Sequence, residues 1–190
     1  NITNANLTTL NRVRVGQSMT VPDIQETFRT VRHGLSSEAV EYPDLDPGAL
    51  RGMRGISNFN GIQTPYDLRH TPVFASDAVL GGAAAFCFLP AENVQARLIQ
   101  FLERYNSITL RSPMSVIIAL YRDFLTIHPG MEGNGRVGRI FLDAMLFHAG
   151  FAPFPHSTPL RTMFYRSFED IMTAVERGYG RNASPVPQSR

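Results

Sequence analysis

The sequence predicts a mostly α-helical domain that carries one small β-hairpin. From residue 90 onward, apolar residues recur at the helical spacing, and proline or glycine stands at the expected helix ends. Two short apolar runs upstream of residue 90 have the pattern of paired strands. A chain of 190 residues with 43% hydrophobic residues can bury one core, so we predict a single domain over residues 1–180 and a flexible tail over 181–190. No apolar run reaches the roughly 18 residues that a membrane span needs.

The first predicted helix lies in the stretch TVPDIQETFRTVRHG. Thr20 can cap it, Pro22 suits its first turn, and Asp23 is the acidic partner of a capping box. Gly34 marks its end. The following residues 36–70 are rich in glycine, proline, asparagine and aspartate, so we expect an irregular connection there.

The predicted hairpin follows this connection. Its strands are TPVFAS at residues 71–76 and AAFCFLP at residues 84–90. The second strand contains Cys87, the single cysteine of the chain, so no intrachain disulfide can form. We expect this cysteine to be a small buried hydrophobic side chain.

Four helices are predicted in the C-terminal half, over residues 92–106, 112–128, 134–150 and 158–178. Ser112 is the expected cap of the second, with Pro113 at its first position. This helix is apolar nearly all round, which is typical of a central, buried helix. Gly150 ends the third, and Thr158 and Pro159 begin the fourth.

The charges of the chain exclude some functions. The net charge of +2 is too small to indicate nucleic-acid binding. All 18 basic residues are arginine, which excludes a Walker-type phosphate loop and Schiff-base chemistry because both need lysine. A GC-rich genome is the simplest reason for the missing lysine, although a chain without lysine also suits a protein that works inside a eukaryotic host. No signal peptide is visible and the chain begins at Asn1, so we interpret it as a piece of a longer protein.

The stretch IHPGMEGNGRVGRIF, residues 127–141, concentrates polar chemistry between two apolar helices. It leads into a helix N-terminus, where unpaired N–H groups and the helix dipole attract anions. Gly133 and Gly135 let the backbone approach a ligand closely. Arg136 and Arg139 lie on one side of that helix, and arginine binds phosphate oxygens in a fork. This combination predicts a site for more than one phosphate.

Glu132 and His128 supply the reactive groups of this loop. A carboxylate beside phosphates is repelled unless a cation lies between them, and Mg²⁺ uses one or two carboxylates together with substrate phosphates. His128 titrates near neutral pH and can take a proton from an attacking hydroxyl. The residue types therefore indicate phosphoryl or nucleotidyl transfer to a hydroxyl.

Other interpretations of these residues remain open. A lone histidine at a helix end is more often a cap than a catalyst, and a lone loop glutamate is usually solvated. A metal hydrolase could use His128, Glu132, His148 and His156, although their spacings match no zinc motif. A catalytically inactive binding module is a further alternative.

The segment HPGMEGNGRVGR resembles the signature of the Fic family, His-x-Phe-x-(Asp/Glu)-Gly-Asn-Gly-Arg-x-x-Arg. The matching positions are His128, Glu132, Gly133, Asn134, Gly135, Arg136 and Arg139. The helices on either side of the motif are similar as well. The resemblance extends over about residues 72–178 and implies a Fic-type helical bundle, in which the hairpin at 72–89 is a flap that aligns a target segment by strand addition.

The resemblance also implies a role for each matching residue. His128 deprotonates the target hydroxyl, and Glu132 holds Mg²⁺. Gly133, Asn134 and Gly135 form an anion hole around the α- and β-phosphates, while Arg136 supports that site and Arg139 reaches the terminal phosphates. Most Fic enzymes transfer AMP from ATP to a Ser, Thr or Tyr hydroxyl of a protein, and others use UTP or a phosphocholine donor.

Gly130 departs from the signature, because the family has phenylalanine at this position to anchor the loop. The motif with glycine at this position is similar to that of a bacterial Fic effector. This similarity favours UTP narrowly over ATP as the nucleotide donor, and it favours a secreted effector that acts in host cytoplasm. A host kinase or GTPase is then the expected protein target. The inhibitory pattern of the family, (Ser/Thr)-x-x-x-Glu-(Gly/Asn), does not occur in the chain.

Overall fold

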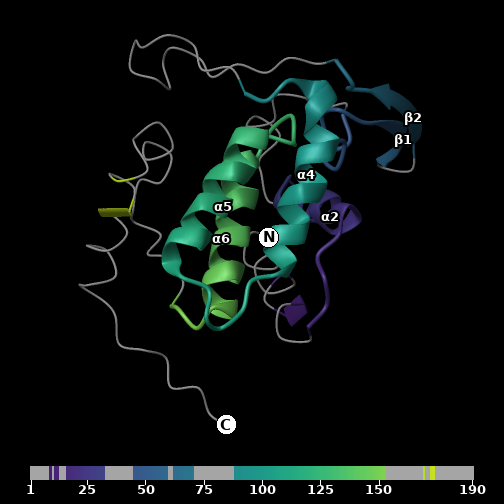
Figure 1. Cartoon of the computed structure of the whole chain (residues 1–190). Helices are drawn as coiled ribbons and strands as arrows, with labels where there is room; N and C mark the ends of the chain where they lie inside the picture. The colour runs from purple at the N-terminus through teal and green to yellow at the C-terminus, as the bar shows by residue number, and fades with distance from the viewer. Residues whose placement is uncertain are drawn as a thin grey trace.

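The computed structural model describes residues 9, 11–12, 16–32, 45–59, 62–70, 88–152, 169 and 172–173. Within these residues the elements, in chain order, are α2 (Val21–Arg32), β1 (Arg54–Phe59), β2 (Ile62–Asp67), α4 (Ala91–Asn106), α5 (Met114–Ile127) and α6 (Asn134–His148). The prediction of a mostly helical fold with one small antiparallel sheet is confirmed (Figure 1). In the part of the chain that the structure describes, no helix is both long and apolar enough to cross a membrane.

The helices form a bundle around α5 and α6, which lie side by side (Figure 1). Helix α4 packs on α5, and α2 contacts both α6 and α4. Aromatic rings join the three long helices at the centre, where Phe124 lies 5.4 Å from Phe101 and 5.0 Å from Phe141, measured between ring centroids. This packing holds the C-terminal end of α5 next to the N-terminal end of α6, so the loop between them has a rigid base on both sides.

The predicted start of α2 is confirmed. The Thr20 backbone N–H donates to Asp23 Oδ2 over 2.9 Å, and the Thr20 hydroxyl donates to the same oxygen over 2.7 Å. The acidic residue of the capping box thus satisfies the backbone donor that the helix leaves free. Ile24, Phe28 and Val31 then form the buried face of the helix.

The expected cap of α5 is wrong by one residue. Pro113 takes the cap position, and its extended backbone starts the helix without a side-chain bond. Ser112 Oγ instead accepts a hydrogen bond from the Thr109 backbone N–H over 2.9 Å, so this serine closes the preceding turn. A serine followed by a proline can serve either purpose, and the turn before the helix decides between them.

The predicted end of α6 is confirmed. Gly150 has a φ of 83°, which is the left-handed region. Its N–H donates to the Phe147 carbonyl over 3.1 Å, and the Phe151 N–H donates to the Leu146 carbonyl over 2.8 Å. These two bonds make a Schellman motif, for which glycine is the preferred residue.

The described hairpin does not lie where we expected it. Strands β1 and β2 pair antiparallel within residues 54–67, inside the stretch that was predicted to be irregular. Phe59 pairs with Ile62, so the connection is two residues long, and its sequence is Asn-Gly. Asn-Gly between short strands is the strongest local hairpin signal, and the many glycines and prolines around it concealed it.

Several predictions fall outside the described residues. They are the strand at 71–76, the part of the next strand before Phe88, Cys87, almost all of the helix at 158–178, and the tail at 181–190. Residues 88–90 are described, and they are not part of a strand.

Candidate active site

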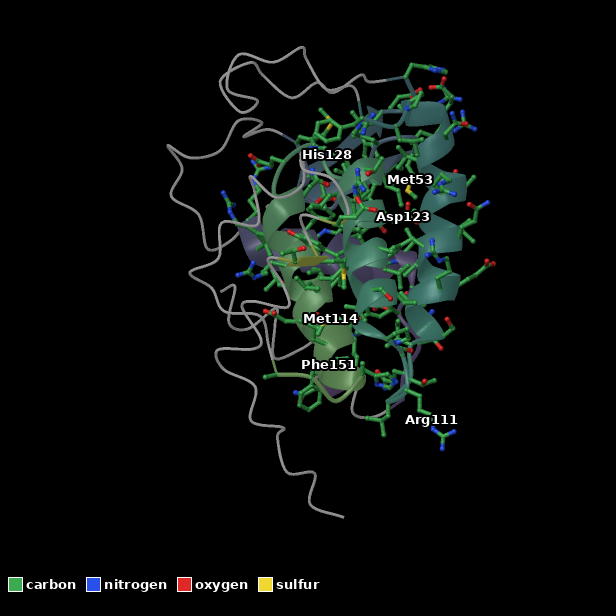
Figure 2. All side chains as sticks on the ribbon, turned by 60° about the vertical axis from the view of Figure 1, so that its left-hand side comes forward. Met53, Arg111, Met114, Asp123, His128 and Phe151 are labelled. Carbon is green, nitrogen blue, oxygen red and sulfur yellow. The ribbon has the colours of Figure 1, made fainter. Side chains whose placement is uncertain are left out.

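His128 ends α5 in an unusual backbone conformation. Its φ of 49° and ψ of 59° are left-handed, and its N–H donates to the Phe124 carbonyl over 3.1 Å. A left-handed residue other than glycine is uncommon and clusters at functional sites. The Phe88 ring stacks on the imidazole, with 3.8 Å between centroids and 28° between planes. Figure 2 shows His128 at one end of the helical bundle and Phe151, which follows α6, at the other.

The surroundings of His128 keep its imidazole neutral. Burial lowers the pKa of this ring most, and the positive charge of Arg51 lowers it further. A hydrogen bond with the Leu125 backbone acts in the opposite direction, and the resulting pKa is about 4. A neutral imidazole at pH 7 has a lone pair that can accept a proton.

Asn134 braces the loop that follows His128. Its Oδ1 accepts from the Gly130 N–H over 2.8 Å, and its Nδ2 donates to the Gly130 carbonyl over 2.8 Å. The side chain is 3% exposed, so this reciprocal pair is shielded from water. Both ends of the amide are used within the loop, so the backbone N–H of Asn134 is a donor that the first turn of α6 offers to an anion.

The N-terminus of α6 is open toward solvent. Gly133 caps it with a φ of 81°, and its carbonyl accepts the N–H groups of Arg136 and Val137, each over 3.0 Å. Helix geometry leaves the N–H groups of Asn134 and Gly135 without an acceptor inside the helix. A Cβ placed on Gly135 would meet no atom within 4 Å. The first turn of α6 therefore presents backbone donors to an accessible space, as an anion site requires.

The two arginines of the motif differ in their surroundings. Arg136 is exposed, and Arg139 is partly buried. Burial raises the pKa of the Tyr121 hydroxyl to about 12, and the positive charge of Arg139 acts on that hydroxyl in the opposite direction. Arg139 therefore lies close to α5, whereas Arg136 faces solvent beside the open helix end.

Glu132 faces a cation from α2. Arg32 Nη1 lies 3.2 Å from Glu132 Oε1, and the two side chains are 9% and 16% exposed. Arg32 Nη1 also donates to the Leu45 carbonyl over 2.9 Å. This ion pair could not be predicted from local sequence patterns, because it joins residues that are far apart in the chain.

The donor set fits Mg²⁺ only if a substrate contributes. Among the described residues, no group of three or more His, Cys, Asp or Glu side chains could hold a metal ion. The single carboxylate of Glu132 is a hard oxygen donor near the open N-terminus of α6, and Mg²⁺ accepts such a donor when phosphates and water complete the set. Glu132 would hold the ion, and substrate phosphates would supply further ligands.

Comparison with known proteins identifies the family of the chain. The sequence model of the Fic/DOC family matches residues 8–146, which is well over half of the chain. The chain belongs to the Fic/DOC family. Fic domains generally transfer nucleotides or other groups to proteins. The match begins far upstream of residue 72, so α2 and the β1–β2 hairpin lie inside the family domain.

A relative from Dictyostelium discoideum supports the same assignment. It is a Fido domain-containing protein, 33% identical to this chain over 106 residues. The aligned part is 54% of this chain and 64% of the relative. The chain thus spans less than two thirds of the length of that protein.

The Fic loop is held by Arg51, which sequence analysis did not identify. This arginine is 1% exposed. Its guanidinium donates to the carbonyls of His128 and Leu89 over 2.9 and 2.6 Å, and its backbone N–H donates to the Pro129 carbonyl over 2.7 Å. A buried arginine is rare, so no local pattern indicates one.

Phe28 fills the space beside the glycine that replaces the Fic phenylalanine. A Cβ on Gly130 would lie 2.3 and 2.6 Å from two atoms of the Phe28 ring. Phe28 comes from α2 and is 2% exposed. The loop is therefore packed against an aromatic ring even though its own sequence lacks one.

The alternative of a metal hydrolase finds no support in the described residues. His148 ends α6, and a helix of this length separates it from Glu132 by about 20 Å. His156 lies outside the described residues.

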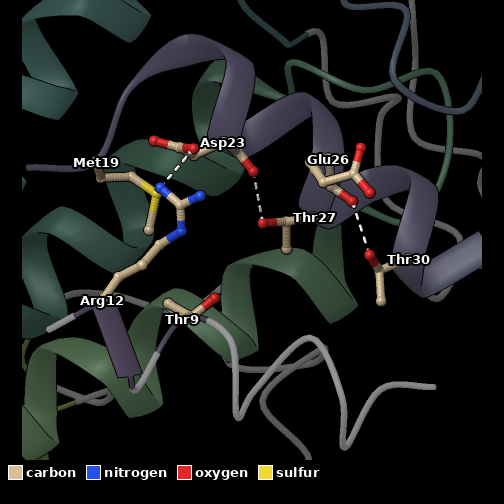
Figure 3. Close-up of a pocket in the computed structure, with 7 residues that line it drawn as sticks. All are labelled: Thr9, Arg12, Met19, Asp23, Glu26, Thr27 and Thr30. Atoms are coloured by element: carbon tan, nitrogen blue, oxygen red, sulfur yellow. Dashed lines mark hydrogen bonds and ion pairs between the residues drawn. The ribbon is translucent and has the colours of Figure 1, made fainter. Parts of the chain in front are cut away.

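A small pocket between α2 and the residues before it is too small to be a nucleotide site (Figure 3). It holds about 30 Å³, room for one or two water molecules, between residues such as Arg12 and Asp23.

Proposed function

We propose that this Fic domain is a protein nucleotidyltransferase, which moves a nucleoside monophosphate from a nucleoside triphosphate to a Ser, Thr or Tyr hydroxyl. The observation that carries the proposal is the position of His128: a neutral imidazole at the end of α5, next to the open N-terminus of α6. A base beside an anion site is the arrangement that attack on a phosphorus atom needs. The spelling of the motif favours UTP narrowly over ATP.

His128 takes the proton from the target hydroxyl while the oxygen of that hydroxyl attacks the α-phosphorus. A phosphodiester bond forms between the protein oxygen and the α-phosphate, and the bond from the α-phosphorus to the bridging oxygen breaks. Pyrophosphate leaves. General-base catalysis of this kind contributes roughly 10²–10⁴-fold in rate.

The backbone at the start of α6 binds the triphosphate in this proposal. The N–H groups of Asn134 and Gly135 point at the phosphates, and the open space at Gly135 admits them. Arg136 and Arg139 add positive charge for the terminal phosphates. Mg²⁺ held by Glu132 would neutralise charge on the leaving pyrophosphate.

The protein substrate would bind beside the predicted flap at residues 72–89. Most of that segment lies outside the described residues, and Phe88 near its end stacks on His128. The segment therefore ends at the base itself, where a strand-like target could present its hydroxyl. A host kinase or GTPase, met by a bacterial effector in host cytoplasm, remains our preferred target because of the motif spelling and the missing lysine.

Labelling experiments test the proposal. The chain is incubated with Mg²⁺, a host lysate and each of the four nucleoside triphosphates labelled at the α-phosphate. His128→Ala runs beside it, and His70→Ala, an exposed histidine after β2, is the matched control. We expect one nucleotide, UTP first, to label a protein band in the wild type and in His70→Ala but not in His128→Ala.

Two results would contradict the proposal. Label that persists in His128→Ala would show that His128 is not the general base. No label with any nucleotide would favour a phosphocholine-type donor or a binding module, and a labelled choline donor separates these two readings.

A further inference from the structure

Arg51 is a fully buried cation that touches the backbone of the catalytic loop. Its Nη1 donates to the carbonyls of Ile127 and His128 over 3.3 and 2.9 Å. Its Nη2 donates to the Leu89 carbonyl over 2.6 Å. We propose that Arg51 is a positioning residue, which fixes the backbone of His128 and the Phe88 ring stacked on it in one arrangement.

Three segments meet at this side chain. The residue before it, Leu50, pairs with Gly130 in an isolated antiparallel bridge. The Arg51 N–H donates to the Pro129 carbonyl over 2.7 Å. Backbone and guanidinium together therefore bind the loop from Ile127 to Gly130, and the guanidinium alone reaches across to Leu89.

The position of this arginine relative to α5 explains how its charge is tolerated. The last carbonyls of a helix have no intrahelical donor and carry the negative end of the helix dipole. The carbonyl of Ile127 is one of these, and that of His128 follows it. An apolar side chain of the same size would fill this space without the cost of burying a charge. The advantage of arginine is therefore the fixed direction of its donors.

Losing these donors would affect His128 in two ways. The left-handed backbone of His128 is held by contacts on its carbonyl, and without them it can relax to the ordinary helical region. The chain at Leu89 would also lose its tie to α5, and with it the Phe88 ring would lose its place on the imidazole. Both changes move the ring that accepts the proton.

The charge of Arg51 supports the same role. Among the described residues, Arg51 is the charged group that acts on the His128 imidazole, together with the Leu125 backbone and the uncharged Phe88 ring. The nearby cation disfavours a second positive charge on the imidazole. Arg51 therefore lowers the pKa of the base, in addition to burial, as well as orienting it.

The test compares Arg51→Met and Arg51→Lys with Arg29→Met. Arg29 holds the buried carboxylate of Asp46 with bonds of 3.1 and 3.0 Å, and it is not among the groups that shift the pKa of His128. Each variant is measured for its melting temperature, for the pKa of His128 by NMR of labelled imidazole, and for the contact between the Phe88 and His128 rings by nuclear Overhauser effects. Transfer kinetics give kcat and KM separately.

We expect Arg51→Met to raise the pKa of His128 and to weaken the contact between the Phe88 and His128 rings. Its kcat should fall at least tenfold, while KM for the nucleotide changes less than threefold because the α6 N-terminus is intact. Arg51→Lys keeps the charge without the fork, so it should keep the low pKa and lose only part of kcat. Arg29→Met should lower the melting temperature and leave the His128 pKa and kcat unchanged.

The proposal is overturned if Arg51→Met lowers only the melting temperature, as Arg29→Met does. If Arg51→Met does not fold, Arg51→Lys decides: full kcat together with an unchanged ring contact would overturn the proposal. The role of Arg51 rests on the proposed function in that His128 is the base. Because the NMR readouts need no activity, a chain that transfers nothing but responds in NMR would refute the proposed function and leave the positioning by Arg51 intact.

Discussion

The ring of Phe28 occupies the space that a side chain on residue 130 would take. Two of its atoms lie 2.3 and 2.6 Å from the Cβ that Gly130 lacks. The Fic signature has phenylalanine at this position, and its absence suggested a loop without an anchor. Here an aromatic ring reaches the loop from α2 instead of from the motif, so the anchor comes from a different part of the chain.

This relationship predicts coupling between the two positions. Gly130→Ala should destabilise the wild-type chain because the new methyl group meets the ring. Phe28→Ala should cost roughly 3–5 kcal/mol of the free energy of unfolding, as large-to-small changes in a core do. Together the two should cost less than the sum, because the methyl then enters vacated space. Urea unfolding of all four proteins measures this, and strict additivity would show that the ring and the loop do not depend on each other.

Asn134 gives a second prediction with a close control. Asn134→Ala leaves the N–H and carbonyl of Gly130 buried without partners, which should cost about 2–4 kcal/mol. Asn106 makes the same reciprocal pair with Met19, over 2.8 and 3.0 Å, away from the loop. Asn106 is exposed whereas Asn134 is buried, so Asn106→Ala should cost less in urea unfolding and retain transfer. Asn134→Ala should lower both the stability and the rate of transfer. Equal activity of the two variants would contradict a bracing role for Asn134.

The ion pair between Arg32 and Glu132 should compete with Mg²⁺. When a partly buried arginine is removed from beside a carboxylate, the affinity of the carboxylate for another cation changes by about 1 kcal/mol, or roughly fivefold. Arg32→Met should therefore lower the Mg²⁺ concentration that gives half-maximal nucleotide binding, as measured by calorimetry. Arg97→Met, which removes an exposed ion pair with Asp123, should leave that concentration unchanged. A higher Mg²⁺ requirement in Arg32→Met would mean that Arg32 orients Glu132 for the metal.

The lowered pKa of His128 predicts a loss of stability in acid. The imidazole has a pKa near 6.5 when unfolded and about 4 when folded. Between these values the unfolded chain binds more protons, so the free energy of unfolding rises with pH across this window. Acidification below pH 4 should cost roughly 3 kcal/mol through this group. His128→Asn should flatten the profile of urea unfolding between pH 4 and 6.5, and His70→Asn should not. Parallel profiles for wild type and His128→Asn would refute the shift.

Local signals in the sequence were enough to place the helices of the bundle. The capping box of Thr20 and Asp23 and the glycine stop at Gly150 act over a few residues, so they can be read without the fold. The same holds for the motif loop, because the ends of α5 and α6 alone set where it lies. The hairpin at 54–67 also had a local signal, its Asn-Gly connection, which was outweighed by the surrounding glycines and prolines.

The contacts that hold the loop in place could not be predicted in this way. Arg51 contacts Ile127, which is 76 positions away in the sequence. The residues of the pairs Arg32–Glu132 and Phe28–Gly130 are even farther apart in the sequence. Each depends on how α2 and the chain after it pack against α5 and α6. An arginine, unlike a leucine, carries no periodic signal that it will be buried. The motif therefore indicates the candidate reactive groups, while the fold supplies the groups that hold their loop in place.

The most direct test of the central claim separates binding from transfer at His128. Wild type and His128→Ala are titrated with the preferred nucleoside triphosphate by calorimetry, and the protein products are then identified by mass spectrometry. The account predicts the same Kd within about threefold for both proteins, since the phosphates bind at the N-terminus of α6. It predicts a nucleoside monophosphate on a Ser, Thr or Tyr hydroxyl with the wild type only. An equal yield of that adduct from His128→Ala, or free monophosphate with no protein adduct from the wild type, would contradict it.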